Sequence, residues 1–237
     1  MISYCTSCKG RRYQLQSTLY HNLQRLKEID AEWIILDYHS NDNLAELLKL
    51  PWFKQLFDIE KIKMFRVTED FPFEMPLAKN LAHRYASGDI LFNLDADNFI
   101  DNSYEALSIL KEDQFLWTKG LRDNGTGGRI GCHRKHFMEL NGYNLDYAGA
   151  GYEDIDFAYR LQKLNLEKVE CDVRILPIKN TREDTLKHTV PGMDHYEINR
   201  AKWNKDKNDP DHIRVNPEGM LHYQGRDIGD IVIRVEG

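Results

Sequence analysis

The chain has 237 residues, which is long enough to bury one substantial hydrophobic core, and its formal net charge is −6. This acidic balance argues against a non-specific nucleic-acid binder, because there is no surplus of basic side chains to neutralise phosphates. No apolar run approaches the roughly 18 to 20 residues that a membrane-spanning helix needs. Residues 1–5 carry no charged start and no apolar stretch of a signal peptide. We therefore expect a cytoplasmic protein of one domain that has no nucleic acid as a partner.

The cysteines give little indication of a metal or redox site. Cys5 and Cys8 have the C-x-x-C spacing that zinc and redox sites use. No second pair of ligands follows at metal-site spacing, and Cys132 and Cys171 are isolated. We expect four reduced thiols with a structural role.

Predicted strands and helices alternate along the first hundred residues. Leu15, Leu19, Leu23 and Leu26 make one apolar stripe of a helix. A second helical pattern starts at 44–48 and ends at Pro51. A third helix is predicted over 78–86, between a proline near its start and a glycine past its end. Strands are predicted over 1–6, 32–37, 62–67 and 90–94.

The second half of the chain is less regular. Helices are predicted over 102–111, from 153 onward and over about 196–203, and strands over 114–118, 129–133 and 231–235. Residues 124–128 read as a flexible turn. The alternation in the first half predicts a mostly parallel, three-layer α/β sheet. Ligands of such sheets bind outside the carboxyl ends of the strands, where polar loops follow Thr6, Asp37 and the strand 90–94.

Asp95 and Asp97 follow the apolar strand 90–94 and are two residues apart. Because successive side chains of a strand alternate, both carboxylates can project from one face at its carboxyl end. Such a pair is a hard-oxygen site for Mg²⁺ or Mn²⁺, which can hold a diphosphate. Two aspartates can also merely solvate a strand end, so the motif alone does not decide.

A second acidic cluster, Glu153, Asp154 and Asp156, stands at a predicted helix start. Acidic residues favour the first helical turn through the macrodipole, so this placement needs no chemistry, above all for Asp156. The preceding loop contains Gly149 and Gly151, which permit close approach to a ligand. Asp154, beside such a cleft, is therefore a candidate general base.

Taken in order, these motifs resemble those of the GT-A glycosyltransferases, in particular the family 2 type and the catalytic domain of the β-1,4-galactosyltransferases. The resemblance covers roughly residues 1–170 and implies a GT-A (Rossmann-like) three-layer α/β/α sandwich. A D-x-D followed about 55 residues later by a Gly-rich E-D-x-D helix start is a fairly specific combination. The matching segments are Thr6-Ser7-Cys8-Lys9-Gly10-Arg11, Asp37, Ala78-Lys79-Asn80-Leu81-Ala82, Leu94-Asp95-Ala96-Asp97, Gly142-Tyr143-Asn144 and Gly149-Ala150-Gly151-Tyr152-Glu153-Asp154-Ile155-Asp156.

The resemblance implies a division of one domain, 1–237, into a nucleotide-binding half (1–100), an acceptor and catalytic half (101–180) and a loop-rich C-terminal extension (181–237). In the first half it places Thr6 and Arg12 near the nucleotide and Asp37 at the uracil or ribose. Lys79 and Asn80 would help to hold the donor, although many relatives have arginine at the position of Lys79.

The resemblance also implies the roles of the two acidic clusters. Asp95 would face the ribose or a metal-bound water, and Asp97 would ligate Mn²⁺ or Mg²⁺. Asp154 would be the catalytic base, and Glu153 would contact the acceptor or donor sugar. Galactosyltransferases have a tryptophan where this chain has Ala150, which puts acceptor stacking through that loop in doubt.

Two substitutes for missing family features can be named. Tyr147 or Tyr152 could replace the tryptophan of the Gly-rich loop. Many relatives complete the metal site with a histidine near the C-terminus, for which His188 and His195 are the candidates. A histidine ligand favours Mn²⁺ over Mg²⁺, and we place His188 ahead of His195.

We expect an inverting transferase that moves a sugar, Gal/GalNAc or Glc/GlcNAc, from a UDP-sugar to the hydroxyl of a glycan or glycolipid acceptor in polysaccharide or glycoconjugate synthesis. Peripheral membrane association and the oligomeric state are left open. A non-catalytic nucleotide-sugar or glycan-binding protein of the same fold is one alternative. A D-x-D phosphatase of the haloacid dehalogenase type is another, but Asn98-Phe99 follows the motif here, whereas those sites continue with Gly-Thr or Thr/Val.

Overall fold

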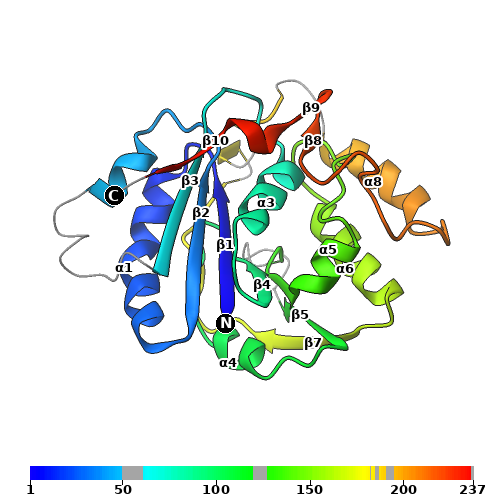
Figure 1. The fold of residues 1–237 in the computed structure, drawn as a ribbon, viewed down its shortest axis with the longest axis horizontal. Coiled ribbons are helices and arrows are strands. Elements are labelled where there is room, and N and C mark those ends of the chain that lie inside the picture. The colour runs from blue at the N-terminus through cyan, green and yellow to red at the C-terminus, as the bar shows by residue number, and fades with distance from the viewer. Residues whose placement is uncertain (50–60, 120–126, 182, 185–186, 191–194, 236–237) are drawn as a thin grey trace.

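The computed structural model describes residues 1–49, 61–119, 127–181, 183–184, 187–190 and 195–235. Its centre is an eight-stranded sheet with strand order β10-β3-β2-β1-β4-β6-β5-β7 (Figure 1). These strands are β1 (Ile2–Cys8), β2 (Ala31–Asp37), β3 (Ile62–Val67), β4 (Ile90–Asn93), β5 (Gln114–Lys119), β6 (Ile130–His133), β7 (Glu167–Asp172) and β10 (Val232–Val235). A separate two-stranded sheet consists of β8 (His222–Tyr223) and β9 (Arg226–Asp227).

The sheet is mostly parallel. Strand β1 lies between β2 and β4 and is parallel to both, and β3 extends the parallel block beyond β2. Strand β6 is antiparallel to both β4 and β5, while β5 and β7 are parallel. The C-terminal β10 closes the other edge by pairing antiparallel with β3. The carboxyl ends of β1, β2 and β4 therefore meet at one edge of the sheet, where ligands of α/β proteins bind.

Helices cover both faces of the sheet, as the strand–helix alternation predicts. The helices among the described residues are α1 (Arg12–Glu28), α3 (Met75–Arg84), α4 (Ser103–Ser108), α5 (Arg134–Glu139), α6 (Glu153–Lys163) and α8 (His195–Asp206), with 3₁₀ turns η1 (Leu44–Lys49) and η3 (Ile228–Ile231). Of these, α8 lies away from the sheet, beside the Gly-rich loop. Among the described residues, no helix combines the length and the apolar character that crossing a bilayer demands.

Two hydrophobic clusters, one on each face, hold these layers together. The stripe Leu15, Leu19, Leu23 and Leu26 of α1 packs on one face, with at most 2% of each residue exposed. Helices α3, α5 and α6 pack on the other face through their own apolar side chains. Burying each such side chain stabilises the fold by roughly 1.5 to 3 kcal/mol. The predicted three-layer α/β/α architecture is thus confirmed (Figure 1).

Several local predictions need correction. The helical pattern at 44–48 forms a 3₁₀ turn, and Pro51 lies outside the described residues. Helix α5 and strand β7 were not predicted from the sequence pattern. The helix and the terminal strand predicted within 181–237 are present as α8, beside the Gly-rich loop, and as β10, at the sheet edge.

The two cysteines of the C-x-x-C motif cannot share a metal ion. Both are buried in β1, and three residues apart in a strand puts their side chains on opposite faces of the sheet. Cys5 belongs to one hydrophobic cluster and Cys8 to the other. Burial raises the pKa of both thiols, as expected for structural, unreactive cysteines.

Candidate active site

A cavity of about 350 Å³ opens at the carboxyl edge of the parallel strands. The turn after β4 and the first residues of α6 bring the two predicted acidic clusters together in its wall. The lining residues are Ser7, Cys8, Lys9, Arg11, Gln14, Phe73, Met75, Lys79, Asp95, Ala96, Asp97, Gly127, Gly128, Glu153, Asp154, Asn180, Thr181 and His188.

A turn, and not a continuing strand, positions the first acidic pair. Strand β4 ends at Asn93, and the backbone N–H of Asn98 donates to the carbonyl of Asp95 at 2.9 Å. The side chain of Asn93 donates to Oδ1 of Asp95 at 3.0 Å, and that of Asn98 donates to Oδ1 of Asp97 at 2.6 Å. The two aspartates thus line one cavity, but turn geometry replaces the strand alternation that the sequence suggested.

The environment of this pair suits a divalent cation. Burial, reinforced by the negative charge of Asp95, raises the pKa of Asp97 to about 6. The hydrogen bonds from the two asparagines go to Oδ1 of each aspartate and leave Oδ2 for a ligand. Carboxylate oxygens are the donors that Mg²⁺ and Mn²⁺ take, so the donor set fits either ion.

A buried ion pair fixes the second cluster. Nζ of Lys79, on α3, lies 2.8 Å from Oε1 of Glu153, and both side chains are at most 6% exposed. Burial alone would lower the pKa of Lys79, but the Glu153 carboxylate more than offsets this and raises it. The second carboxylate oxygen of Glu153 accepts a hydrogen bond from the backbone N–H of Gly151 at 2.8 Å. Lys79 therefore holds the end of the Gly-rich loop in place through Glu153.

The neighbouring Asp154 is left accessible. It lines the cavity and is partly exposed, and its Oδ1 accepts a hydrogen bond from the backbone N–H of Ile155 at 2.8 Å. Burial, together with the adjacent charge of Glu153, raises the pKa of Asp154 to about 7. A carboxyl group with such a pKa suits proton transfer near neutral pH.

The third acid of this segment, Asp156, faces away from the cavity. It is fully buried, and its carboxylate lies 2.7 Å from Nε of Arg160 and 2.5 Å from Nε2 of His212. These contacts tie helix α6 to the segment that follows α8. Asp156 is therefore a structural residue, as the helix-start interpretation suggested.

Helices α3 and α8 hold the Gly-rich loop from two sides. Glu74 accepts a hydrogen bond from the backbone N–H of Gly149, and the carbonyl of Gly149 accepts one from Met75 N–H at 2.7 Å. From α8, Nδ2 of Asn199 donates to the carbonyls of Ala148 at 2.9 Å and Gly151 at 2.8 Å. The loop before Asp154 is thus fixed by its backbone.

Four residues expected at the nucleotide lie outside the cavity lining. Thr6 donates to the carbonyl of Leu94, and Asn80 donates to the carbonyls of Tyr143 and Met220. Both side chains are fully buried. Their hydrogen bonds serve the fold, because they link segments that are far apart in the chain.

Asp37 and Arg12 are the other two. Asp37 is fully buried, accepts from the backbone N–H of Ser40 at 2.7 Å and pairs with Arg66. Arg12 donates through its side chain to the carbonyl of Asn43 at 2.8 Å. With these partners the structure gives neither side chain a place at the cavity, and their expected nucleotide contacts are not supported.

The two candidate histidines lie in different surroundings. His188 lines the cavity, but its ring lies against Gly10, where a Cβ would come within 2.1 Å of Nε2. His195 is buried against Gly149, and its Nε2 contacts the carbonyl of Val190 at 3.2 Å. Within the described part of the chain, the three-residue group whose potential ligand atoms lie within 4.8 Å of one another is Asp156, Asp206 and His212. A histidine ligand at His188 therefore stays a prediction, and His188 is the one of the two histidines that lines the same cavity as Asp95 and Asp97.

Only one of the two tyrosines that could replace the tryptophan of the Gly-rich loop is accessible to a ligand. Tyr147 is buried, and its hydroxyl donates to Asp206 at 2.8 Å, so it cannot stack on a ligand. Tyr152 is partly exposed at the start of α6.

The cavity also contains basic residues that the sequence prediction left out. Lys9 and Arg11 lie in the polar turn after β1. They belong to the matching segment 6–11, for which the resemblance implied no role at these two positions. Lys9 donates to Asp70 at 2.5 Å, and Arg11 donates to Asn180 at 2.5 Å. The positive charge of Arg11 also acts on Asp97, where it partly opposes the rise in pKa that burial and Asp95 cause. The signal was present as a basic turn at the carboxyl end of the first strand.

Comparison with known proteins adds a family match to this geometry. The family model of the N-terminal domain of galactosyltransferase matches residues 112–189, which is less than half of the chain but includes the Gly-rich loop and the second acidic cluster. A search of curated protein sequences finds no significant match.

Solved structures share the fold over most of the chain. The mannosyltransferase PcManGT from Pyrobaculum calidifontis, in complex with GDP-Man and Mn²⁺, matches 88% of this chain at 15% identity and a TM-score of 0.61. This chain spans only 64% of the length of that protein. A Drosophila β1,4-galactosyltransferase 7 complex with manganese, UDP-Gal and xylobiose covers 84% of this chain and 79% of its own at 18% identity and a TM-score of 0.56. S. aureus TarS with UDP-GlcNAc covers 89% and 68% at 13% identity and a TM-score of 0.60.

The chain therefore has the fold of the GT-A glycosyltransferases. Residues 112–189 match a galactosyltransferase family model, and the fold is similar to that of enzymes whose complexes contain Mn²⁺ and nucleotide-sugars.

Proposed function

We propose that this chain is an inverting, metal-dependent glycosyltransferase that moves a hexosyl group from a UDP-sugar to the hydroxyl of a glycan or glycolipid. The observation that carries the proposal is one cavity whose wall contains both Asp95 with Asp97 and Glu153 with Asp154. Related structures contain GDP-Man, UDP-Gal or UDP-GlcNAc, which supports a nucleotide-sugar donor. A family 2 type of enzyme, a cytoplasmic location and a pathway of polysaccharide or glycoconjugate synthesis are further parts of the proposal.

The first acidic pair would hold the metal and the diphosphate. Asp97 and Asp95 would bind Mn²⁺ or Mg²⁺ through the oxygens that the asparagines leave available. When bound, this ion neutralises the departing diphosphate as a Lewis acid. Lys9 and Arg11, on the same wall, would add positive charge near the diphosphate. The whole of 1–237 would act as one domain, since residues 1–100 and 101–180 both supply this cavity.

The second pair would perform the proton transfer. Asp154 would take the proton of the acceptor hydroxyl while that oxygen bonds to the anomeric carbon. The bond from that carbon to the diphosphate oxygen breaks on the opposite face, which inverts the configuration, and UDP leaves. Glu153 would hold the loop beside the donor sugar through Lys79 and Gly151.

Release of UDP tests the proposal. UDP-Gal, UDP-GalNAc, UDP-Glc and UDP-GlcNAc are each incubated with the chain and Mn²⁺, and UDP is measured over time. We expect one donor to be hydrolysed slowly in the absence of acceptor, and we expect Asp97→Asn to abolish this release. The exposed Asp146→Asn is the control and should release UDP at the wild-type rate.

The same assay separates the proposal from its alternatives. A protein that binds UDP with Mn²⁺ but releases none from any donor is a nucleotide-sugar-binding protein. Phosphate release from a simple phosphoester, with nucleophilic attack by Asp95, would indicate a phosphatase instead.

A further inference from the structure

The buried face of α1 contains two polar side chains among its leucines. Thr18 and Asn22 are fully buried and lie one turn apart on this helix, between the leucines of the apolar stripe. A buried hydroxyl or amide without a partner costs free energy, so such residues need hydrogen-bond partners close by. Neither side chain lines the cavity, so neither contacts a ligand there. Any role at the site must come from the groups that they bond.

Both side chains bond to the backbone of the turn that carries the first acidic pair. The hydroxyl of Thr18 donates to the carbonyl of Ala96 at 3.0 Å. The Nδ2 group of Asn22 donates to the carbonyl of Asn98 at 3.1 Å, and its Oδ1 accepts from the backbone N–H of Ile100 at 2.7 Å. Helix α1 therefore holds this turn at three backbone groups.

The other carbonyls of the turn 94–98 also accept hydrogen bonds from the protein. Their donors are Thr6 of β1 to Leu94 at 2.5 Å, Asn98 of the turn itself to Asp95 at 2.9 Å and Ile178 after β7 to Asp97 at 2.8 Å. With the two bonds from α1, each of the five carbonyls from 94 to 98 has a donor. The backbone of the turn is thus fixed at every peptide group.

The turn has an apolar side and a side that carries charge. Ala96 belongs to the hydrophobic cluster that contains the α1 stripe, and Asp95 and Asp97 contribute carboxylates to the cavity wall. Groups that orient the ligands of a metal ion raise its affinity, because less ordering is then required when the ion binds. The bonds from α1 act on the backbone between the two carboxylates and directly after them.

We propose that Thr18 and Asn22 are positioning residues, which hold the turn 94–98 from outside the cavity so that its two carboxylates are preset for a divalent cation. The proposal rests on the proposed function, in which this pair binds Mn²⁺ or Mg²⁺. Mg²⁺ requires nearly ideal octahedral geometry, whereas Ca²⁺ accepts a flexible set of about six to eight oxygens. A loosened turn should therefore lose more affinity for Mg²⁺ than for Ca²⁺.

Calorimetry of UDP with Mn²⁺, Mg²⁺ or Ca²⁺ tests this role by binding alone, without turnover. Asn22→Ala removes both side-chain bonds, and we expect the affinity for UDP with Mn²⁺ or Mg²⁺ to fall by about tenfold or more. With Ca²⁺ the loss should be smaller, so the preference for Mg²⁺ over Ca²⁺ decreases. Thr18→Val removes one bond and should act in the same direction, by about two- to tenfold. Thr18→Ser keeps the hydroxyl and should bind like the wild type.

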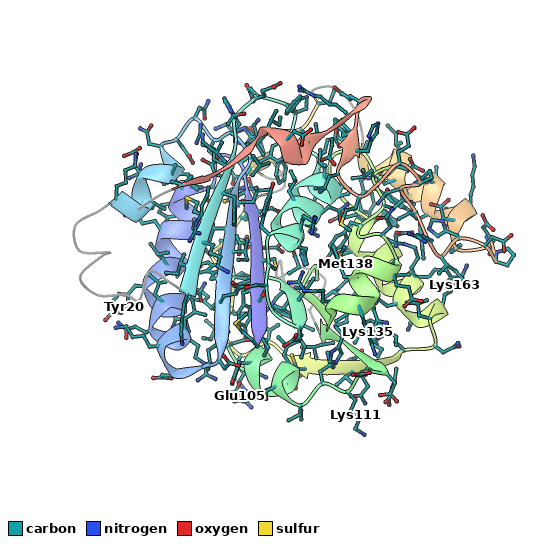
Figure 2. All side chains as sticks on the ribbon, viewed as in Figure 1. Tyr20, Glu105, Lys111, Lys135, Met138 and Lys163 are labelled. Atoms are coloured by element: carbon teal, nitrogen blue, oxygen red, sulfur yellow. The ribbon has the colours of Figure 1, made fainter. Side chains whose placement is uncertain are left out.

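The preference between cations separates positioning from a purely structural role. A variant that is only less stable has a lower folded fraction, which affects every cation equally and leaves the ratio of affinities unchanged. Asn216→Ala is the matched control, because this buried amide also bonds backbone groups, two carbonyls and one N–H, but lies outside the cavity lining. It should lower the Tm and keep the wild-type preference. Tyr20→Ala changes the outer side of α1, where Tyr20 is 59% exposed (Figure 2), and should keep the preference as well.

Hydrogen exchange of the metal-free protein reports on the turn itself. The backbone N–H of Ile100 donates to Asn22, so it loses its acceptor in Asn22→Ala. We expect it to exchange about tenfold faster in that variant than in the wild type, and at the wild-type rate in Asn216→Ala.

The positioning role is overturned if Asn22→Ala and Thr18→Val bind UDP with the affinity and cation preference of the wild type, or if Asn216→Ala shifts the preference as much as they do. The transferase proposal fails by a different result, namely if UDP binds with Mn²⁺ but no donor releases it. A shifted cation preference in the α1 variants would then still support the positioning role. If EDTA leaves the binding of UDP unchanged, both proposals are wrong.

Discussion

Asp154 and Asp156 are two residues apart in the first turn of α6, yet their carboxylates have opposite surroundings. Asp156 is fully buried and contacts Arg160 at 2.7 Å and His212 at 2.5 Å. Asp154 is partly exposed on the cavity wall, and Lys79, whose charge acts on it, is paired with Glu153 instead. Since the helix dipole acts on both, the difference between them comes from their side-chain partners.

The pKa values follow these partners. Burial alone would raise the pKa of Asp156, but Arg160 and His212 more than offset this and lower it. Burial and the charge of Glu153 raise the pKa of Asp154 to about 7. The fold thus stabilises the charged form of Asp156. It destabilises the charged form of Asp154, as is typical of a catalytic base.

The largest expected effect is on turnover. Asp154→Asn removes the proposed base but keeps the size of the side chain, so we expect UDP-sugar transfer to fall by about 10² to 10⁴-fold. UDP binding with Mn²⁺, measured by calorimetry, should remain nearly at the wild-type value because the first acidic pair is intact. Turnover at the wild-type rate would show that Asp154 is not the base.

The matched variant at the neighbouring position should affect folding instead. Asp156→Asn leaves the buried guanidinium of Arg160 without its counter-charge, and we expect the free energy of unfolding to fall by about 3 to 5 kcal/mol. Urea denaturation followed by circular dichroism measures this loss. An Asp156 variant that unfolds like the wild type would contradict the structural role.

The pH dependence of turnover should reveal the raised pKa of Asp154. The base must be deprotonated, so we expect kcat/KM to rise with pH up to about 7 and then to level off. Because the pKa of Asp97 is raised to about 6, metal binding should weaken below that pH. Calorimetry of UDP with Mn²⁺ at each pH separates the two effects. A flat profile between about pH 5.5 and 8 would rule out Asp154 as the titrating base.

The smallest expected effect is a gain in stability. In the folded protein the pKa of Asp154 is about 7, which is above the unfolded value near 3.9. Its favourable contribution to the free energy of unfolding is therefore fully present below about pH 4 and is lost as the pH rises through 7. Asp154→Asn avoids this loss. Allowing for solvent access, we expect it to raise the free energy of unfolding by roughly 1 to 2 kcal/mol at pH 8 and by little at pH 4. Equal stabilities at both pH values would contradict the raised pKa.

Regular periodicity made the first half of the fold predictable. The leucine stripe of α1 and the apolar runs of β1, β2 and β4 appear as predicted, within a few residues. Strand β7 escaped prediction because its sequence, Glu167 to Asp172, carries charges on most positions and only Val169 and Cys171 pack against the hydrophobic core. The 3₁₀ form of η1 escaped as well, because helical spacing does not distinguish it from an α-helix.

The two acidic clusters of the site were also visible in the sequence, whereas the roles of single residues around them were not. Asp37 has the position expected of a nucleotide contact, but Arg66 on the neighbouring strand takes its carboxylate. His188 reaches the cavity wall, but it faces Gly10. Each outcome depends on a partner that is distant in the chain.

By itself the sequence determined the α/β class, the position of the Asp95–Asp97 turn after a buried strand and the acidic start of α6, because these depend on local periodicity and composition. Only the tertiary structure decided which carboxylates are neutralised and which remain open to a ligand. Lys79 meets Glu153 across 74 positions of the chain, and His212 meets Asp156 across 56. Charge pairing acts through space over a few ångströms, so the fold, and not the spacing along the chain, separates the candidate base from its structural neighbour.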